Sequence, residues 1–362
     1  MGLQNSPVME LLEETLGSIG PLDSDAEHAA AARLDSLTKP PGSLGYLEKA
    51  IRRYAAIRGD GSARVGRAAI AVFVADHGVA DEGVSAFPQA VTVEMLRNLA
   101  GGGAAISVLA RRLGYDLRVI DVGVKTDTSS PPISGVTYRR IGAGTANFVC
   151  GFAMNREQVR RALEVGIEVA RELAEGGATL IGIGEMGIAN TTAATAVLSA
   201  ITEIAPSALA GRGTGLDEGG VRRKVAIVER ALKLHAGSLQ TGESILGAVG
   251  GFEIAAMAGT CLAGASLRVP VIVDGFIATA AAAAAEKIRP GLLEYLFFSH
   301  RSAEGGHARA LERLGVRPIL DLDMRLGEGT GAALAMNVLE AGLDLFHSMA
   351  TFSSAGVSGK VR

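Results

Sequence analysis

The sequence predicts an α/β fold, with a doubly wound, mainly parallel sheet of six strands and a smaller helical domain. Six short apolar runs alternate with longer stretches of helical spacing along the chain. These runs are continuous rather than alternating apolar and polar, as in strands that are buried on both faces of a parallel sheet. In addition, 48% of the 362 residues are hydrophobic, which is enough to bury a large core.

The first sixty residues predict a small helical appendage. Apolar residues recur at helical spacing in MELLEETL, AEHAAAARLDSL and LEKAIRRYAAI, and the tight turn KPPGSLG precedes the last of these segments. We therefore expect short helices before the first strand.

The six predicted strands follow in order along the rest of the chain. They are RAAIAVFVADHG, DLRVIDVGV, ATLIGIGEMG, VPVIVDGF, EYLFFSH and RPILDLDMRLGEG. A long helix between the second and third is predicted to start at Asn155, with Gln158 in the capping-box position, and to end at Gly176. The very apolar region from Ile254 to Ala285 is broken by Arg268 and Asp274, so it predicts core rather than a membrane span.

Polar residues and glycines cluster where the predicted strands end. In open α/β sheets, ligands bind beyond the carboxyl ends of the strands. We therefore single out these positions: Asp76, His77, Gly78, Asp121, Gly184, Glu185, Gly187, Asp274, Gly275, Ser299, His300, Ser302, Gly327, Glu328 and Gly329.

The segment GIGEMG satisfies the G-x-G-x-x-G pattern of dinucleotide sites, but its context differs. Glu203, at the offset expected for a ribose contact, falls at the end of the same helical stretch rather than at the tip of a next strand. The N–H groups at the start of that helix, with the side chains of Asn190, Thr191 and Thr192, predict a site for a phosphate or similar anion. A merely tight strand-to-helix turn is the alternative.

Glu185 and Glu328 are the sharpest signals in the sequence. Each lies in a glycine-rich turn between a strand and a helix, where burial raises the pKa of a carboxyl group and suits it to accept a proton. The helix dipole acts in the opposite direction, and a glutamate that only caps helix amides is the alternative for each residue. Two such glutamates at one edge of a sheet favour a shared site.

Composition and charge favour a small-molecule ligand in the cytoplasm. The net charge is −3 and no basic block recurs, so neither nucleic acid nor an anionic membrane is indicated as a partner. Cys150 and Cys261 have no metal-binding spacing and are predicted to be buried and reduced. Asp76, His77, Asp274 and the histidines His300 and His307 match no compact metal motif, so we expect no metal and no cofactor.

Seven segments together resemble the family of nicotinate-nucleotide:dimethylbenzimidazole phosphoribosyltransferases. They are LTKPPGSLGYLE, VADHGVADEGVSAFPQAVT, GIGEMGIANTTAA, GRGTGLD, VDGFIATAAA, SHRSAEGGH and LDMRLGEGTGAALA, in the order of the family. The resemblance implies transfer of a phosphoribosyl group from nicotinate mononucleotide to a benzimidazole-type base, which makes the lower-ligand nucleotide of cobalamin.

The resemblance also implies roles for residues. Glu328 resembles the catalytic base and Glu185 a second carboxylate of the site. The remaining residues implied or predicted to bind substrate are Asp76, His77, Ser85, Phe87, Gln89, Gly184, Gly187, Asn190, Thr191, Lys224, Asp274, Ser302, Gly305, Gly327 and Gly329. Among them, Lys224 and Ser302 resemble phosphate and ribose contacts.

Finally, the resemblance implies a homodimer and two domains. Residues 1–60 and a C-terminal helix at about 333–362 are expected to form the small helical domain, and residues 61–332 the large catalytic domain. Two alternatives remain open. One is a metal-dependent phosphohydrolase that uses Asp76, His77, Asp274 and His300, and the other is a non-catalytic module that senses nucleotides.

Overall fold

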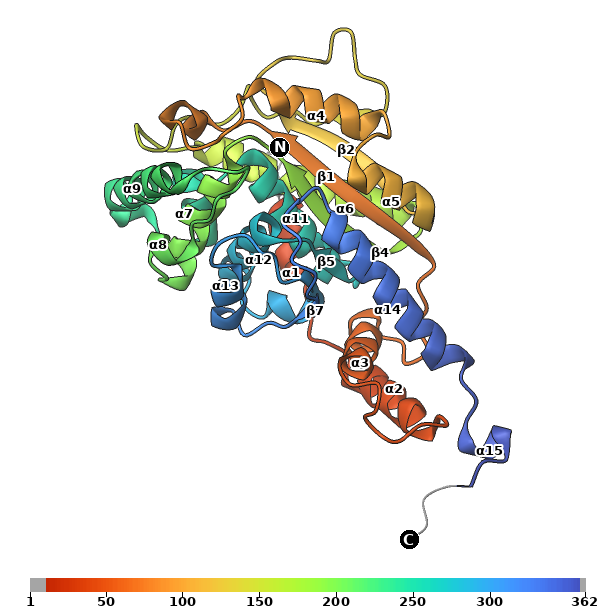
Figure 1. Cartoon of the computed structure of the whole chain (residues 1–362). Coiled ribbons are helices and arrows are strands. Elements are labelled where there is room, and N and C mark those ends of the chain that lie inside the picture. The colour runs from red at the N-terminus through yellow and green to blue at the C-terminus, as the bar shows by residue number, and fades with distance from the viewer. Residues whose placement is uncertain (1–10, 359–362) are drawn as a thin grey trace, which may run out of the picture.

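The computed structural model describes residues 11–358, which form helices around one parallel sheet (Figure 1). The sheet has seven strands in the order β3-β2-β1-β4-β5-β6-β7, and all paired strands are parallel. The strands are β1 (Arg67–Ala75), β2 (Asp116–Gly123), β3 (Val136–Tyr138), β4 (Ala178–Met186), β5 (Val271–Val273), β6 (Leu296–His300) and β7 (Pro318–Leu320).

The predicted α/β class and parallel sheet are confirmed, but the predicted count of six strands is wrong. The six predicted runs contain β1, β2, β4, β5, β6 and β7, and β3 is additional. This strand is only three residues long, is half-buried and lies at the edge of the sheet, so it has no continuous apolar run that would predict it.

Fifteen α-helices lie within the described residues. They are α1 (Leu11–Gly17), α2 (Ser24–Ser36), α3 (Tyr46–Arg58), α4 (Ala90–Ala100), α5 (Ala105–Leu113), α6 (Arg156–Glu175), α7 (Asn190–Thr202), α8 (Pro206–Leu209), α9 (Glu218–Leu234), α10 (Gly242–Val249), α11 (Phe252–Ser266), α12 (Phe276–Ile288), α13 (His307–Arg313), α14 (Thr330–Ser348) and α15 (Phe352–Ala355). The predicted capping box of α6 is confirmed, with Asn155 as N-cap and Gln158 at N3.

Helices cover both faces of the sheet. α11 and α12 pack against the central strands on one face, and α6 packs against α11, whereas α4, α5 and α14 cover the other face. α11 and α12 are almost entirely buried, which confirms that the apolar region from Ile254 to Ala285 is core. No helix within residues 11–358 is long and apolar enough to cross a membrane.

The terminal helices pack in two places. α2 and α3 pack against each other, and α3 also packs against α14, which runs from the sheet towards them in Figure 1. The Arg33 guanidinium of α2 donates hydrogen bonds to the carbonyl oxygens of Phe346 and His347 in α14. α1 instead packs on α6 and α11. The sequence-based start of this first helix, at Met9, lies outside the described residues.

The prediction that both cysteines are buried is wrong for Cys150. Cys261 is buried in α11, but Cys150 is exposed in a loop, where its N–H donates to the carbonyl oxygen of Asn147. The prediction rested on the number and spacing of the cysteines, which do not determine burial, and the chain at Cys150 forms a surface turn.

The strand order places a switch point between β1 and β4. From β1 the chain builds outward through β2 and β3, and from β4 it builds outward in the other direction through β5, β6 and β7. The two connections that leave β1 and β4 therefore diverge, which leaves a crevice beyond the carboxyl ends of these strands. His77 follows β1 at this edge, and Glu185 lies at the end of β4.

Candidate active site

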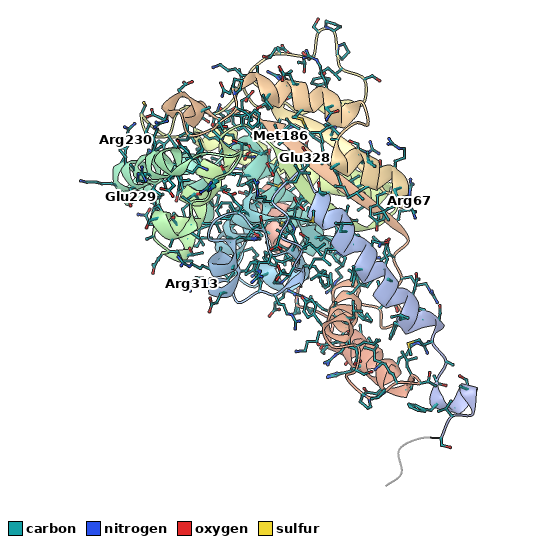
Figure 2. The ribbon with its side chains drawn as sticks, in the orientation of Figure 1. Arg67, Met186, Glu229, Arg230, Arg313 and Glu328 are labelled. Atoms are coloured by element: carbon teal, nitrogen blue, oxygen red, sulfur yellow. The ribbon has the colours of Figure 1, made fainter. Side chains whose placement is uncertain are left out.

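A cavity of about 240 Å³ opens beside this switch point. Its lining comes from the ends of β4, β5 and β6 and from the loop before α14, and it includes Glu185, Met186, Gly275, His300, Ser302, Arg325 and Glu328. Figure 2 labels Met186 and Glu328 near the centre of the molecule. A larger cavity of about 690 Å³ lies away from this edge, between α1 and the starts of α6 and α10. The smaller cavity holds both glutamates that the sequence singles out.

Glu328 lies in a turn whose backbone is held in an unusual conformation. Gly327, Glu328 and Gly329 have φ values of 84°, 62° and 84°, so a non-glycine residue occupies the left-handed region between two glycines. The Asp274 carboxylate accepts the N–H of Gly329 at 3.1 Å. A side chain at Gly184 of β4 would place its Cβ 2.3 Å from the Gly329 nitrogen, so only glycine allows this close approach.

The two glutamates predicted from the sequence meet in this cavity. Glu185 reaches it from β4 and Glu328 from the turn before α14, and both are nearly fully buried. A Cβ at Gly327 would lie 2.5 Å from Glu185 Oε1, so the Glu328 turn packs directly on the Glu185 carboxyl. The Asn190 side-chain amide donates a hydrogen bond to Glu185 Oε2, whereas Glu328 Oε2 has no hydrogen-bonding partner within residues 11–358.

Burial shifts both carboxyl groups towards the protonated form. It raises the pKa of Glu185 to about 8, and repulsion from Glu253, Asp274 and Glu328 adds to the effect, although the Asn190 amide opposes it. Burial, followed by repulsion from Asp274, also raises the pKa of Glu328 above its usual range. At neutral pH, Glu185 therefore holds a proton for most of the time, and Glu328 is the better candidate for a proton acceptor.

Asp274 and the histidines near it support the Glu328 turn. Burial raises the Asp274 pKa, while the His300 ring, 4.0 Å away, opposes the shift. Asp274 also accepts the N–H of Ala332 at 2.9 Å. Burial lowers the pKa of His307 to about 3, so this ring is neutral: its Nδ1 accepts the backbone N–H of Ser302, and its Nε2–H donates to the Thr279 hydroxyl. Among the described residues, no group of three or more acidic, histidine or cysteine side chains is arranged to hold a metal ion.

The predicted anion site lies at the start of α7. Thr191 lines the cavity, and its hydroxyl accepts a hydrogen bond of 3.1 Å from the buried Lys224 ammonium. Lys224 also donates to the carbonyl oxygen of Gly211, and Glu304 accepts the N–H of Gly213. Burial lowers the Lys224 pKa. The loop of residues 211–214 is therefore held between a buried cation and a buried carboxylate at one end of the cavity.

The remaining predicted residues divide into three groups, of which two belong to the cavity. Phe87, Gly187, Ser302 and Gly327 line the cavity, and Ser85 bonds Thr214, which also lines it. Gly184, Gly305 and Gly329 shape its walls through the backbone, and Asp274 holds the Glu328 turn through its carboxylate.

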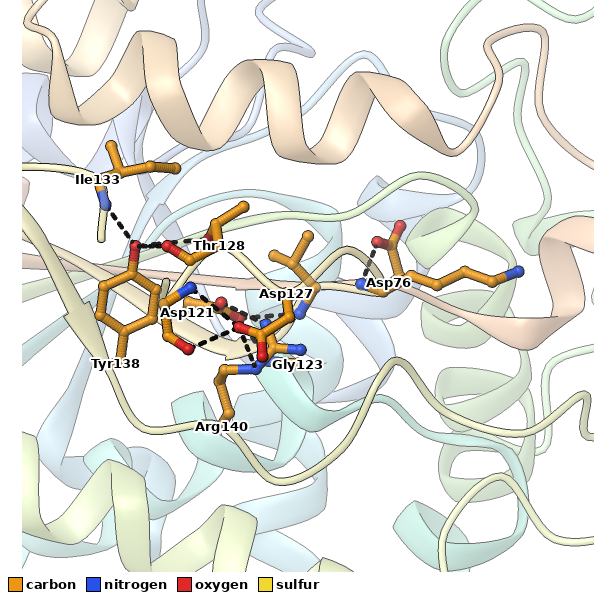
Figure 3. Close-up of polar contacts among 11 residues, drawn as sticks. Asp76, Asp121, Gly123, Asp127, Thr128, Ile133, Tyr138 and Arg140 are labelled. Atoms are coloured by element: carbon orange, nitrogen blue, oxygen red, sulfur yellow. Dashed lines mark hydrogen bonds and ion pairs between the residues drawn. The ribbon is translucent and has the colours of Figure 1, made fainter. Parts of the chain in front are cut away.

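Asp76, His77 and Gln89 do not line the cavity. Asp76 accepts the Lys125 N–H at 2.8 Å, beside a second cluster in which Arg140 pairs with Asp121 (Figure 3). The Gln89 amide donates to the carbonyl oxygen of His77. Substrate contacts of these three residues stay a prediction.

Comparison with known proteins identifies the family. The sequence model of the phosphoribosyltransferase family matches residues 19–357. The chain belongs to this family. A Chloroflexus aggregans protein named nicotinate-nucleotide–dimethylbenzimidazole phosphoribosyltransferase is 49% identical over 352 residues, covering 97% of this chain and 99% of the relative. A Chlorobaculum parvum protein of the same name is 47% identical over 348 residues, covering 96% and 98%.

A solved structure agrees with this assignment. The crystal structure of CobT from Thermus thermophilus has a TM-score of 0.87 at 47% identity and covers 92% of this chain and 99% of its own. The family resemblance predicted from the sequence motifs is confirmed.

Three charged residues of this phosphoribosyltransferase were not predicted as part of the site. Glu304 and Arg325 line the cavity, and Glu253 pairs with His77 behind it. Glu304 and Arg325 lie inside the quoted motifs SHRSAEGGH and LDMRLGEGTG. Their position near the ends of predicted strands is the sequence feature that could have identified them as site residues. Glu253 lies in an apolar helix far from any predicted strand end, and nothing local in the sequence marks it.

Proposed function

We propose that this phosphoribosyltransferase transfers the 5-phosphoribosyl group from nicotinate mononucleotide to 5,6-dimethylbenzimidazole or a related base. The products are α-ribazole 5′-phosphate and nicotinate, in cobalamin biosynthesis. The names of relatives at 46–49% identity over nearly the whole chain support this activity. The observation that carries it is the pair of buried glutamates, Glu185 and Glu328, on one cavity at the switch point of the sheet.

The chemistry of the reaction needs one proton acceptor. The bond that breaks joins ribose C1′ to a pyridinium nitrogen, so nicotinate departs with a neutral ring and needs no proton. The attacking benzimidazole forms the new bond to C1′ through one nitrogen and bears a proton on the other. Removal of that proton avoids a cationic product. Attack from the face opposite the leaving ring converts a β-linked donor into an α-linked product.

The glutamates take different parts in this proposal. Glu328 accepts the benzimidazole proton, because its Oε2 is unpartnered among the described residues and its carboxyl is less completely enclosed than Glu185. Glu185 keeps its proton at neutral pH, so it acts as a hydrogen-bond donor that orients the ligand. Separate environments for two neighbouring carboxyl groups are a common way to divide such roles.

The substrates fit opposite ends of the cavity. The 5′-phosphate lies by the start of α7, beside Thr191, which lines the cavity and accepts a hydrogen bond from the buried Lys224 ammonium. The aromatic base lies against the half-exposed side chains of Phe87 and Leu326, which line the cavity. This order places ribose C1′ near Glu185 and Glu328.

We also propose a cytoplasmic homodimer with the two domains described above. The exposed apolar side chains Phe87 and Leu326 at the cavity support a second copy near this edge. Light scattering should give twice the chain mass of 37.1 kDa. A mass of one chain would remove the dimer from the proposal.

The activity is tested by incubating the purified protein with nicotinate mononucleotide and dimethylbenzimidazole and by identifying the products by mass. We expect α-ribazole 5′-phosphate and nicotinate in equal amounts. Release of inorganic phosphate that depends on added metal would favour the hydrolase alternative. Tight binding of the nucleotide without any product would favour the sensing module.

A further inference from the structure

A buried hydrogen-bonded pair lies behind the turn that carries Glu185. His77 Nε2 and Glu253 Oε1 are 2.6 Å apart, and both side chains are fully buried. His77 follows β1 at the switch point, and Glu253 lies in the first turn of α11. Neither residue lines the cavity, so the pair acts on a substrate only through other residues.

The His77 ring lies between α11 and the turn after β4. On one side, a Cβ at Gly251 would lie 2.3 Å from His77 Cε1 and 2.7 Å from Glu253 Oε2. On the other side, a Cβ at Gly187 would lie 3.4 Å from His77 Cδ2 and 2.4 Å from the carbonyl oxygen of Ala75. Gly187 comes two residues after Glu185, so the imidazole lies beside the backbone that leads away from this carboxyl.

Charge connects the same residues. Among the charged neighbours of Glu185, Glu253 has the largest effect and raises the Glu185 pKa, after the larger effect of burial and ahead of Asp274 and Glu328. Asp76 also faces the pair: Glu253 raises its pKa and His77 lowers it, although burial dominates. The pair therefore lies within electrostatic range of one carboxyl of the active site.

We propose that His77 and Glu253 are positioning residues for the transfer reaction, which hold Glu185 in the cavity by bracing the turn after β4. This inference rests on the proposed function, since it assigns Glu185 a part in that reaction. It also revises the sequence-based expectation for His77, which becomes a residue that acts through Glu253 and Gly187 rather than by touching substrate.

The test is a double-mutant cycle with Glu185. Glu253→Gln keeps the size of the side chain but removes the charge that pairs with His77. It should lower kcat by about 10- to 100-fold and change the KM of the donor by less than about 2-fold. In a Glu185→Ala background, the same substitution should lower kcat by less than about 2-fold, because the side chain that the pair positions has been removed.

Glu48→Gln is the matched control. Glu48 also lies in the first turn of a helix and forms a buried ion pair of 2.8 Å, with Lys39, but neither residue lines the cavity. Its effect on kcat should be the same factor in the wild-type and Glu185→Ala backgrounds. If Glu253→Gln also gives one factor in both backgrounds, the pair is only structural and the proposal is overturned.

A second readout does not depend on turnover. Infrared difference spectra between the wild type and Glu185→Gln assign the carboxyl band of Glu185 in the free protein. Glu253→Gln should move the titration of this band to lower pH, because a negative neighbour is removed. An unmoved titration overturns the proposal even in a protein without turnover, whereas an inactive wild type with a moved band rejects only the proposed function.

His77→Gln provides the same test if Glu253→Gln does not fold. Its amide nitrogen can occupy the place of Nε2 and donate to Glu253, so it should retain more of kcat than His77→Ala. Equal kcat values for these two variants, both with native thermal unfolding, would contradict the bracing role.

Discussion

At the scale of single residues, two glutamates in one cavity have different surroundings. Glu185 is enclosed on all sides and bonded by Asn190, and burial raises its pKa to about 8. Glu328 lies in a strained turn at the cavity wall, with one oxygen unpartnered within residues 11–358. The sequence placed both residues in glycine-rich turns, but only the packing around each distinguishes them.

Glu328→Gln should lower kcat by about 10² to 10⁴, the usual effect of losing a positioned general base. The substitution keeps the size of the side chain and its ability to form hydrogen bonds, so donor binding should change little. The wild type should lose activity on the acid side as Glu328 becomes protonated, at a pH above the usual range of a glutamate. The rate of product formation against pH, for both proteins, measures this.

A near-normal rate and an unchanged acid limb in Glu328→Gln would assign Glu328 to the helix start alone. The proton would then pass to Glu185 or to solvent. Glu185→Gln serves as the comparison: it should lower kcat less, because the wild-type group already carries a proton at neutral pH.

At the scale of elements, the site depends on how closely β4 and the turn before α14 approach. Gly184→Ala should lower kcat by more than about 10-fold, because its Cβ would lie 2.3 Å from the Gly329 nitrogen and displace Glu328. Gly182→Ala is the control on the same strand. Its Cβ would meet side-chain atoms rather than the Glu328 turn, at 2.8 Å from the flexible Met336 and 3.2 Å from Ile70, so kcat should change by less than about 3-fold. Equal effects on kcat, at equal thermal stability, would show that this approach does not place Glu328.

The start of α7 gives a second prediction at this scale. Lys224→Ala should raise the KM of nicotinate mononucleotide, and nicotinate riboside, which lacks the 5′-phosphate, should be a far poorer donor for the wild type. Lys233→Ala on the same helix α9 is the control, because Lys233 is exposed in the last turn. Steady-state kinetics with both donors measure the effect. Equal use of riboside and nucleotide would rule out phosphate binding at this site.

The elements also show which parts of the fold can be predicted from the sequence. The strands with continuous apolar runs and the capping box of α6 were predictable, because each depends on neighbouring residues. β3 was not predictable, because three half-buried residues at the edge of a sheet show no periodic hydrophobic pattern. The His77–Glu253 contact joins residues 176 positions apart and depends on Gly251 and Gly187 leaving room for the ring. Contacts of this kind follow from the fold and leave no local pattern.

At the scale of the whole molecule, the topology gathers acidic residues from distant parts of the chain at one edge of the sheet. Asp76, Glu185, Asp274 and Glu328 all have pKa values raised chiefly by burial. In the folded state these groups bind protons more tightly than in the unfolded chain. Their contribution to the free energy of unfolding is therefore complete below the unfolded pKa and is lost as the pH rises through the folded pKa.

For Glu185 this window runs from its ordinary pKa of 4.5 to about 8. The glutamine side chain of the Glu185→Gln variant cannot ionise. The free energy of unfolding of this variant should therefore not show the decrease that Glu185 causes in the wild type across this pH range. The difference in free energy of unfolding between variant and wild type should grow in favour of the variant by roughly 3–5 kcal/mol between pH 5 and pH 9. Urea unfolding of both proteins at these two pH values measures it, with Glu48→Gln as a control for loss of a buried glutamate elsewhere. If the wild type and Glu185→Gln lose stability in parallel, Glu185 is already ionised in the free protein. The proposed difference in protonation between Glu185 and Glu328 would then have to arise only when the substrates bind.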